Sequence, residues 1–437
     1  MKLTPSHRLY GLGVILLVSL FICSRNFSRM GDQSFLVPLA VAGIAYLLAI
    51  REFFSRPQFP RHVVVIGLAL AAVWHFQFLR MSPGLDDDIH RYVWDGRVQR
   101  LGYNPYILVP REPALAGLHT PETRALNNPE VPSPYPPGAQ LFFRAVTAIH
   151  ESAFALKVAF VICDMAIVFV LRDFLRRTQQ GQHWVLAYAW HPLLATEVAG
   201  SGHVDIVGVL LLLVSAAALV RRWRALAAIS FGLAVAVKFL PVVLLPLYWR
   251  RVRLRDGALA AVVFGLLYVP FLSHGRIPFG SLGTYVQRFR FNDPVFATLE
   301  RVTAPQVVAG LAVLVGLLTA IWMRRKYGES SSFAWPMTAS LLCAPVVYPW
   351  YMLWLLPFVR SVGALPILIW TLTIIPTYYV WRLRTLGRPW VVPDWIMALE
   401  YGSVAVAAAI VAWLRFSRSA ALQGSADQVE GSQPHRS

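Results

Sequence analysis

VVVIGLALAAVWHFQFLRM at residues 63–81 is followed almost at once by GLDDDIHRYVWDGRVQRLGYNPY at residues 84–106. The first stretch is apolar enough to lie in lipid, and it is close to the ~20 residues that a helix needs to cross the hydrocarbon core. The second begins with three consecutive carboxylates, Asp86, Asp87 and Asp88. A membrane helix that leads directly into a carboxylate cluster predicts a helical membrane protein with a polar site at the membrane surface.

The whole chain of 437 residues has the composition of a membrane protein, with 57% hydrophobic and 14% charged residues and a mean hydropathy of +0.54. Soluble domains contain roughly 25% charged residues. We predict an all-α polytopic protein with about 12–14 membrane segments, forming one transmembrane domain over residues 1–416. A disordered cytoplasmic tail is expected at 417–437. The apolar runs lie at 9–23, 35–50, 62–80, 153–175, 184–199, 204–220, 225–249, 257–272, 306–323, 333–347, 350–360, 363–380 and 395–414.

Several other classes of protein are excluded. The first apolar run ends in LFICSRNF, without the small-residue cleavage site of a signal peptide, so we expect a retained helix. The three cysteines, Cys23, Cys163 and Cys343, have no metal-binding or disulfide-framework spacing. The net charge of +18 comes from short basic clusters between apolar runs. This is the positive-inside pattern of a plasma-membrane protein, not the footprint of a nucleic-acid partner.

One apolar segment cannot be a simple crossing. ALAAISFGLAVAVKFLPVVLLPLYW at 225–249 has the basic clusters RRWR and RRVRLR on its two sides. Lys238 and Pro241 lie near its middle, where a charge is costly and a proline removes a helical hydrogen bond. We therefore predict a re-entrant pair of half-helices that enters and leaves from the cytoplasm. The break between them is tolerated where it lines a cavity.

The first extracytoplasmic loop, residues 81–152, is too long for a simple connection. DDIHRYVWDGRVQRLG predicts an amphipathic helix on the outer surface. PSPYPPGAQLFF at 132–143 places Tyr135 in a rigid, proline-rich stretch before a second short helix. That stretch either holds one surface helix against the other or contributes Tyr135 to a binding site.

The three aspartates indicate chemistry beyond helix capping. Asp88 alone can cap the free amides of the predicted helix. Adjacent like charges, however, raise one another's pKa, and a carboxylate with a raised pKa suits a general base that deprotonates an alcohol. Other polar residues of this stretch are candidates for binding substrate or phosphate, namely Arg91, Asp95 and Arg97.

Further candidates are predicted at the same level of the membrane. HPLLATEVAGSGHVD at 191–205 contributes Glu197, His203 and Asp205, which either bind a phosphate or a metal ion or pair with one another. APVVYPWYMLWLLPF at 344–358 contributes Tyr348 and Trp350, which either flank a sugar or lipid chain or form an interfacial aromatic belt. Arginines in the loops 273–305 and 381–394 run against the positive-inside trend. They either bind an anionic ligand, which is the simplest reason, or are scattered surface charges that face lipid headgroups.

The sequence resembles the polyprenyl-phosphate-sugar-dependent glycosyltransferases of superfamily C, in particular the bacterial polytopic mannosyltransferases related to those that elongate mycobacterial mannans. The resemblance spans most of the chain, and its first motif is the most specific. The motifs follow in the family's order: DDIHRYVWDGRVQRLGYNPY (87–106), PYPPGAQLFF (134–143), HPLLATEVAGSGHVD (191–205), KFLPVVLLP (238–246) and YPWYMLWLLPF (348–358).

This resemblance implies a polyprenyl-phosphate-linked sugar donor, most simply mannose, and a glycan or glycolipid acceptor in the envelope. It also implies an extracytoplasmic site, inversion at the anomeric carbon, and a carboxylate base in the first loop. We expect Asp87 to be the base and Asp88 to orient the acceptor, with Lys238 and His203 stabilising the leaving phosphate. Asp86 is an additional aspartate beside the family's usual acidic pair. Because some members use a divalent metal, Asp86, Asp87 and Asp88 are also candidate ligands for Mg²⁺ or Mn²⁺.

Two rival readings remain open. A transporter or flippase for lipid-linked sugars would use the Lys238 break as its substrate site, but such proteins usually show paired broken segments in two similar halves. A different donor sugar, such as glucose or arabinose, would leave the same sequence pattern.

Overall fold

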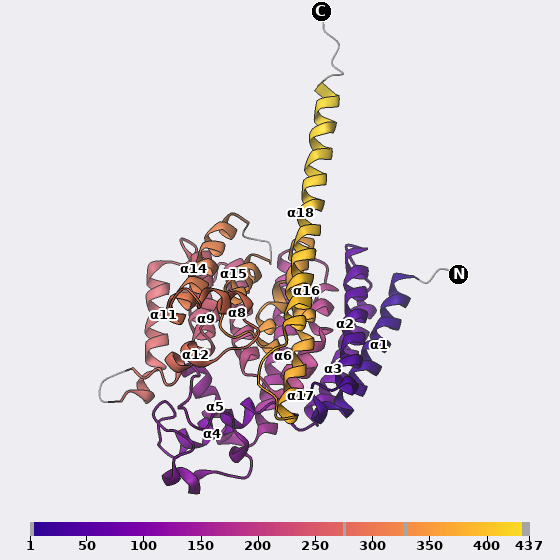
Figure 1. Ribbon diagram of the computed structural model, residues 1–437. Coiled ribbons are helices and arrows are strands. Elements are labelled where there is room, and N and C mark those ends of the chain that lie inside the picture. Colours follow the sequence, from indigo (N-terminus) through magenta and orange to yellow (C-terminus); the bar gives the residue numbers. More distant parts are fainter. Residues whose placement is uncertain (1–3, 274–276, 327–330, 431–437) are drawn as a thin grey trace, which may run out of the picture.

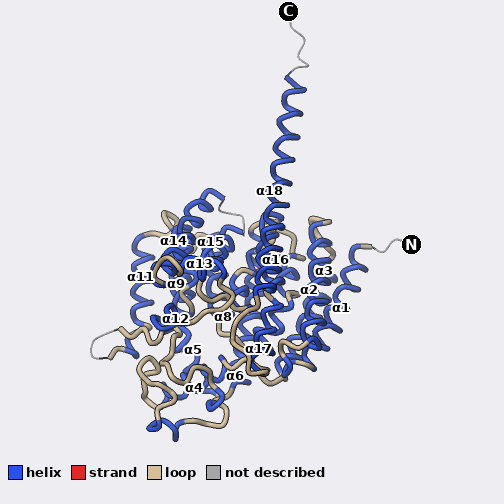
Figure 2. Tube along the Cα trace, viewed as in Figure 1, coloured by secondary structure: helices blue, strands red, loops and turns tan. Residues whose placement is uncertain are grey.

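The computed structural model describes residues 4–273, 277–326 and 331–430 of the chain (Figure 1). These residues form helices joined by loops and contain no β-strand, as Figure 2 shows. An isolated bridge joins Phe291 and Val346. The predicted all-α class is therefore confirmed.

Among the described residues, eight helical segments are long and apolar enough to cross a membrane. Two shorter apolar helices, α8 (Asp205–Val220) and α9 (Arg224–Val237), lie between them in the chain. The protein is therefore a polytopic membrane protein. The eight segments are α1 (Pro5–Arg25), α2 (Gln33–Phe54), α3 (Arg61–Leu79), α6 (Ala153–Arg177), Leu254–Phe271 with α11 (Leu254–Leu266), α14 (Pro305–Met323), Val362–Thr385 with α16 (Leu365–Thr373) and α17 (Tyr379–Thr385), and Asp394–Ser417 in α18 (Asp394–Glu430).

The basic clusters gather at the end of the bundle away from the 81–152 loop. At that end Arg221 pairs with Asp173, and Arg324 donates to the carbonyl of Trp249. In Figure 1 the α4 and α5 helices of the loop occupy the opposite end. The basic clusters and the long loop therefore lie at opposite ends of the helical bundle.

The predicted break in residues 225–249 is confirmed. Helix α9 ends at Val237, and Lys238 has an extended backbone with φ −157° and ψ 140°. The end of α9 lies against the loop, because a Cβ on Gly138 would be 2.8 Å from the carbonyl oxygen of Ala236. The chain then returns through η5 (Leu240–Leu244) and α10 (Leu245–Tyr248). Arg251 next donates to the carbonyl of Arg324 at the basic end.

The run at 184–199, expected as one regular crossing, is irregular. It forms α7 (Trp184–Ala189), a turn, and the π-helix η4 (Leu194–Ser201). Pro192 follows the turn at Trp190 and His191, and its missing N–H interrupts the regular ladder of hydrogen bonds. Residues 185–209 are all buried, so this segment runs through the core of the bundle. Such π-helical turns occur frequently at functional sites.

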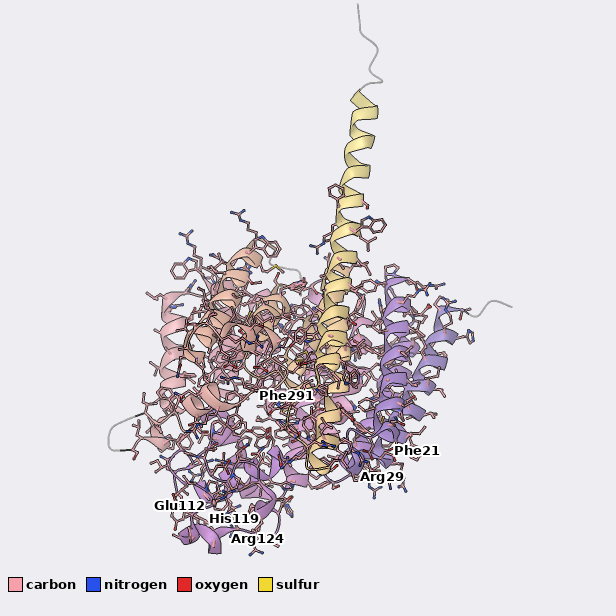
Figure 3. The ribbon with its side chains drawn as sticks, viewed as in Figure 1. Phe21, Arg29, Glu112, His119, Arg124 and Phe291 are labelled. Carbon is pink, nitrogen blue, oxygen red and sulfur yellow. The ribbon has the colours of Figure 1, made fainter. Side chains whose placement is uncertain are left out.

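The helix that was predicted on the outer surface in the first loop is present, but other parts of the loop cover it. Helix α4 (Asp88–Arg100) is buried on most sides, because the segment with η2 (Pro113–Leu118) and η3 (Thr123–Ala125) folds over it. Trp94 of α4 stacks on His119 at 4.1 Å, and both Glu112 and His119 lie at the loop end of the molecule in Figure 3. On its other side, Tyr92 stacks on Phe143 of α5 (Pro137–Ile149) at 4.5 Å.

Three of the described α-helices remain, two before and one after the membrane segment α14. They are α12 (Leu282–Arg288), α13 (Pro294–Leu299) and α15 (Ser331–Leu342). Helix α18 extends to Glu430, past Ser417 where the tail was expected to begin, and helix-forming Ala, Gln and Glu residues are common there. Residues 431–437 of the expected tail lie outside the described residues.

The contact between α4 and α5 generates a stability prediction. A Cβ on Gly96 would be 2.7 Å from the carbonyl oxygen of Phe143, so Gly96→Ala must push the two helices apart. We expect a loss of about 1–3 kcal/mol, measured by thermal unfolding of the purified protein. Gly117→Ala is the matched control in the same loop, since a Cβ there meets no atom within 4 Å. Equal melting temperatures for the two variants would contradict this packing.

Candidate active site

A cavity of about 780 Å³ lies where the first loop meets the membrane helices. Its walls come from the start of α4, the Lys238 break, the segment around α12, and the chain that enters and leaves η8 (Pro349–Trp354). The cavity brings together nine of the residues predicted from the sequence: Asp86, Asp87, Asp88, Arg91, Tyr135, Asp205, Lys238, Tyr348 and Trp350.

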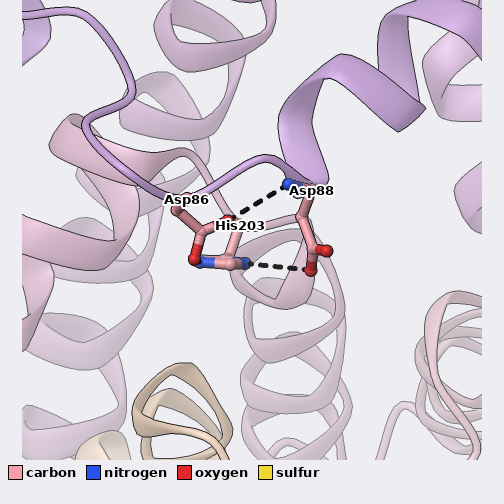
Figure 4. A group of neighbouring side chains, drawn as sticks. All are labelled: Asp86, Asp88 and His203. Atoms are coloured by element: carbon pink, nitrogen blue, oxygen red, sulfur yellow. Dashed lines mark hydrogen bonds and ion pairs between the residues drawn. The ribbon is translucent and has the colours of Figure 1, made fainter. Parts of the chain in front are cut away.

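The three aspartates have different surroundings. Asp86 is buried, and its Oδ1 accepts the backbone N–H of Asp88 at 3.1 Å, which holds the first turn of α4 in place (Figure 4). The side chain of Asp88 is 17% exposed and accepts a hydrogen bond from the amide of Asn127. Asp87 is 24% exposed and pairs with Arg384 at 3.0 Å. All three carboxylates line the cavity, but Asp86 is buried and also holds the backbone of α4, whereas Asp87 and Asp88 are the two that are partly exposed to the cavity.

Burial and neighbouring charge make the two cavity-facing carboxyls unusually basic. Burial, with the charge of Asp86, raises the pKa of Asp88 to about 7, against the opposing effect of His203. The same two causes raise the pKa of Asp87, but there the Arg384 guanidinium opposes them. Asp88 can therefore take up and release a proton near neutral pH, as a general base must.

His203 lies behind the aspartates and is fully buried. Its Nε2 is 3.0 Å from Oε2 of Glu197 and 3.4 Å from Oδ2 of Asp86, and its Nδ1 is 3.8 Å from Oδ2 of Asp88. The ring stacks on Trp350 with centroids 3.9 Å apart. The π-helix η4 sets this position, because the backbone N–H groups of Gly202 and His203 both donate to the carbonyl of Glu197.

Lys238 supplies a cation to the cavity. Because its backbone is extended at the end of α9, its side chain leaves the helix, and Nζ lies 2.6 Å from Oδ1 of Asp205. Nζ also lies 3.6 Å from the centroid of the Tyr351 ring. Asp205 is held in turn by the indole N–H of Trp354 at 2.6 Å. One wall thus carries carboxylates and another carries a positioned ammonium group.

A family model for the N-terminal domain of alpha-(1->6)-mannopyranosyltransferases matches residues 16–252, more than half of the chain. The match covers the aspartates, Glu197, His203 and Lys238. The chain belongs to this mannosyltransferase family. The protein is therefore a membrane glycosyltransferase. No curated protein and no solved structure matches it.

Four predicted binding residues of the mannosyltransferase do not line the cavity. Glu197 and His203 are paired with each other, and Asp95 and Arg97 are engaged within the first loop. Asp95 pairs with Arg91 at 3.1 Å and accepts hydrogen bonds from Ser133 and Gln140. Arg97 pairs with Glu151 at 2.6 Å on the far side of α4. These contacts tie α4 to α5 and to the proline-rich stretch, so both residues stabilise the loop. Arg91 does line the cavity, although its other donors meet the carbonyls of Asn128 and Val131.

Several cavity residues were missed because their position depends on distant parts of the chain. Arg288, Arg384 and Trp390 come from two later loops and line the cavity. The excess of arginines in those loops was the one signal for the first two. Asn127 carried no sequence signal. Arg290, from the same arginine-rich loop, is paired with Glu300 at 2.6 Å.

The described residues include one group of side chains that could hold a divalent metal. Among the described residues, Asp86, Asp88 and His203 offer ligand atoms that lie within 4.8 Å of one another. Neither ring nitrogen of His203 makes a well-aligned hydrogen bond, and neither do the carboxylate oxygens of Glu197. Carboxylate oxygens and an imidazole nitrogen fit Mn²⁺, and Mg²⁺ less well because of the nitrogen. His203 thus takes the place predicted for Asp87, which pairs with Arg384.

The structural assignment of Asp95 is testable. Asp95→Asn leaves the buried Arg91 guanidinium without its carboxylate, and we expect a loss of about 3–5 kcal/mol in the free energy of unfolding. Thermal unfolding of the purified protein measures this loss. The control is Arg111→Gln, which removes an exposed ion pair between Arg111 and Glu130 in the same loop. If Asp95→Asn melts like wild type and yet loses sugar transfer, the residue belongs to the substrate site after all.

Proposed function

We propose that this mannosyltransferase moves mannose from a polyprenyl-phosphate carrier to a hydroxyl of an envelope glycan or glycolipid, with inversion at the anomeric carbon, on the extracytoplasmic face of the plasma membrane. The observation that carries the proposal is the single cavity that holds both Asp88 and Lys238. The family supports mannose as the sugar. A base and a cation in one cavity are what displacement of a phosphate by a hydroxyl requires.

In the proposed reaction the acceptor oxygen attacks C1 of the mannose as its proton passes to a carboxylate. The bond between C1 and the phosphate oxygen breaks, and polyprenyl phosphate leaves with the electron pair. Each mannose transferred therefore moves one proton to the base and one negative charge to the leaving oxygen. Inversion follows if the base and the phosphate lie on opposite faces of the sugar.

We assign the base to Asp88 rather than to Asp87, which was expected from the sequence. Asp87 is engaged with Arg384, and an ion pair stabilises the ionised carboxylate and weakens it as a base. Asp88 has no guanidinium partner among the described residues, and its pKa of about 7 suits proton transfer at neutral pH. Asn127 orients its carboxylate.

Lys238 and Arg288 are the cations that we assign to the leaving phosphate. Both line the cavity, and preorganised cations stabilise a developing oxyanion without reorganisation. Asp205 holds Lys238 by one oxygen, which leaves the other hydrogen bonds of the ammonium group for a ligand. His203 does not line the cavity, and we assign it to compensating the charge of the carboxylates.

Apolar residues next to Lys238 support a lipid carrier. Val237, Phe239 and Leu240 line the cavity from the broken segment, and Leu341 and Ala344 line it from the end of α15. An apolar wall adjoining a phosphate site allows a polyprenyl chain to run between helices while the scissile bond stays at headgroup level. Tyr348 and Trp350, which line the same cavity, are placed to flank the sugar.

A divalent cation would be held by Asp86, Asp88 and His203, where it would supply positive charge to the carboxylate cluster. With Asp88 so engaged, Asp87 is the carboxylate left to take the proton. The carboxylates are compensated either by a bound divalent cation or by His203. Assays of sugar transfer in EDTA, and again after addition of MnCl₂, distinguish these alternatives. Restoration by Mn²⁺ assigns the charge compensation to a metal, and full activity in EDTA assigns it to His203.

The assignment of the base predicts unequal effects of two matched variants. Asp88→Asn should lower the rate of transfer by about 10²–10⁴-fold, the usual contribution of a general base. Asp87→Asn should cost about tenfold or less, because it removes an orienting ion pair. The assay uses membranes with labelled polyprenyl-phosphate mannose, with glucose and arabinose donors in parallel. Equal protein levels are the control.

The reverse order of the two variants would return the base to Asp87. Transfer only from glucose or arabinose would change the donor sugar. Binding of the lipid donors by wild type without any transfer would favour a transporter of lipid-linked sugars.

The pKa of Asp88 also predicts a pH profile. The base must be ionised to accept a proton, so kcat/KM should rise with pH, pass its midpoint near 7, and level off above it. In Asp88→Asn this limb should disappear from the residual activity. A wild-type profile that is flat between about pH 5.5 and 8.5 would contradict the assignment.

A further inference from the structure

Trp390 and Arg384 form a distinct part of the cavity wall. Arg384 lies in the last turn of α17 and Trp390 in the segment between α17 and α18, so both are beyond the region that the family model matches. Arg384 pairs with Asp87 at 3.0 Å, and its guanidinium carbon lies 5.7 Å from the centroid of the Trp390 ring. The segment is therefore joined directly to the carboxylate cluster of the first loop.

The indole of Trp390 is held rigidly. Its ring meets Trp381 edge-on at 4.8 Å and lies 5.7 Å from Phe291, which Figure 3 labels near the middle of the molecule. Pro389 precedes it, and the buried Val392 anchors the chain just beyond it. A cavity-lining ring fixed in this way loses little conformational entropy when it binds a ligand.

Trp390 also differs from the other tryptophan near the aspartates in having ring surface to offer. Trp350 has His203 stacked on it at 3.9 Å and Tyr348 at 4.3 Å, and it is only 5% exposed. Trp390 is half-buried, and the Arg384 guanidinium over it is close to the ~6 Å limit of a cation–π contact. The side chain of Arg384 is itself 56% exposed, so it can move aside or donate to a ligand.

We propose that Trp390 is the stacking platform for the terminal sugar ring of the acceptor, with Arg384 donating to that ring's hydroxyls. A pyranose has an apolar C–H face that packs on an indole and a rim of hydroxyls that matches charged and amide groups. Neither a protein hydroxyl nor a lipid chain has both. This inference rests on the proposed function, and it makes Trp390 and Arg384 determinants of acceptor specificity.

The position of the platform fits the proposed chemistry. Arg384 links Trp390 to Asp87, and Asp87 is adjacent to the base Asp88 in the chain. A sugar on Trp390 therefore presents its hydroxyl toward the carboxylates. The donor is assigned to other residues, Lys238 and Arg288, so the two substrates have separate determinants.

The test compares acceptor and donor kinetics in the full-length protein in nanodiscs. The acceptor is a short α-linked manno-oligosaccharide. Trp390→Ala should raise the KM for the acceptor by about tenfold or more, with donor KM and kcat within about threefold of wild type. Trp390→Phe, which keeps an aromatic face, should recover most of the loss and shows that the site is folded. Trp395→Ala is the control, since this tryptophan is 62% exposed on α18 and does not line the cavity.

Saturation-transfer NMR with the same oligosaccharide and no donor gives a readout that does not depend on transfer. Binding by wild type that is lost in Trp390→Ala supports the platform even if no transfer is ever found, in which case only the proposed function fails. Unchanged oligosaccharide binding and acceptor KM in Trp390→Ala overturn the inference. A change confined to donor KM also overturns it, because it would assign this wall to the lipid phosphate.

Discussion

Charge buried in a membrane protein has to be compensated inside the chain, and in this mannosyltransferase the compensation centres on His203. The imidazole lies between the carboxylates of Glu197, Asp86 and Asp88 and has no access to solvent. Loss of one partner would leave the others as uncompensated buried charge, which is far more costly than loss of a surface pair. The π-helix η4 and the start of α4 are both arranged around this contact.

The local backbone shows how tightly the two segments are coupled. Gly202 has φ +83°, and a Cβ there would lie 2.6 Å from Cδ1 of Ile89 in α4. The turn before His203 therefore packs directly against the helix that carries Asp88. Trp350, stacked on the imidazole, extends the same contact into the cavity wall. Interruptions in the membrane segments at Pro192 and Lys238 thus place backbone and polar side chains where regular helices could not.

Sequence patterns predicted the features that depend on local chemistry. The apolar runs predicted the long helices, and a lysine close to a proline predicted the break at Lys238. The three consecutive like charges indicated that the aspartates belong to a functional site. The residues that sequence alone misassigned or missed have partners far along the chain. Asp95, for example, was predicted to bind substrate, but it accepts hydrogen bonds from Ser133 and Gln140 and so holds the loop together.

Long-range folding also explains the remaining differences. Arg384 pairs with Asp87, which lies almost 300 positions earlier in the chain. Helix α4 was expected on the surface because the polar segment that covers it, which packs Leu115 and Leu126 on Trp94, has no strong periodic pattern of its own. Such contacts are set by how the outer loops fold together, and no local propensity encodes them.

The most direct test of the central claim is a structure of the full-length protein with a mannosyl polyprenyl phosphate bound. The account predicts that the phosphate lies within hydrogen-bond reach of Lys238 Nζ and that the polyprenyl chain leaves past Leu240. It also predicts that Asp88 faces C1 from the side opposite the phosphate. A donor whose phosphate lies beside Arg384 and Trp390, or whose C1 is turned away from Asp88, would contradict it.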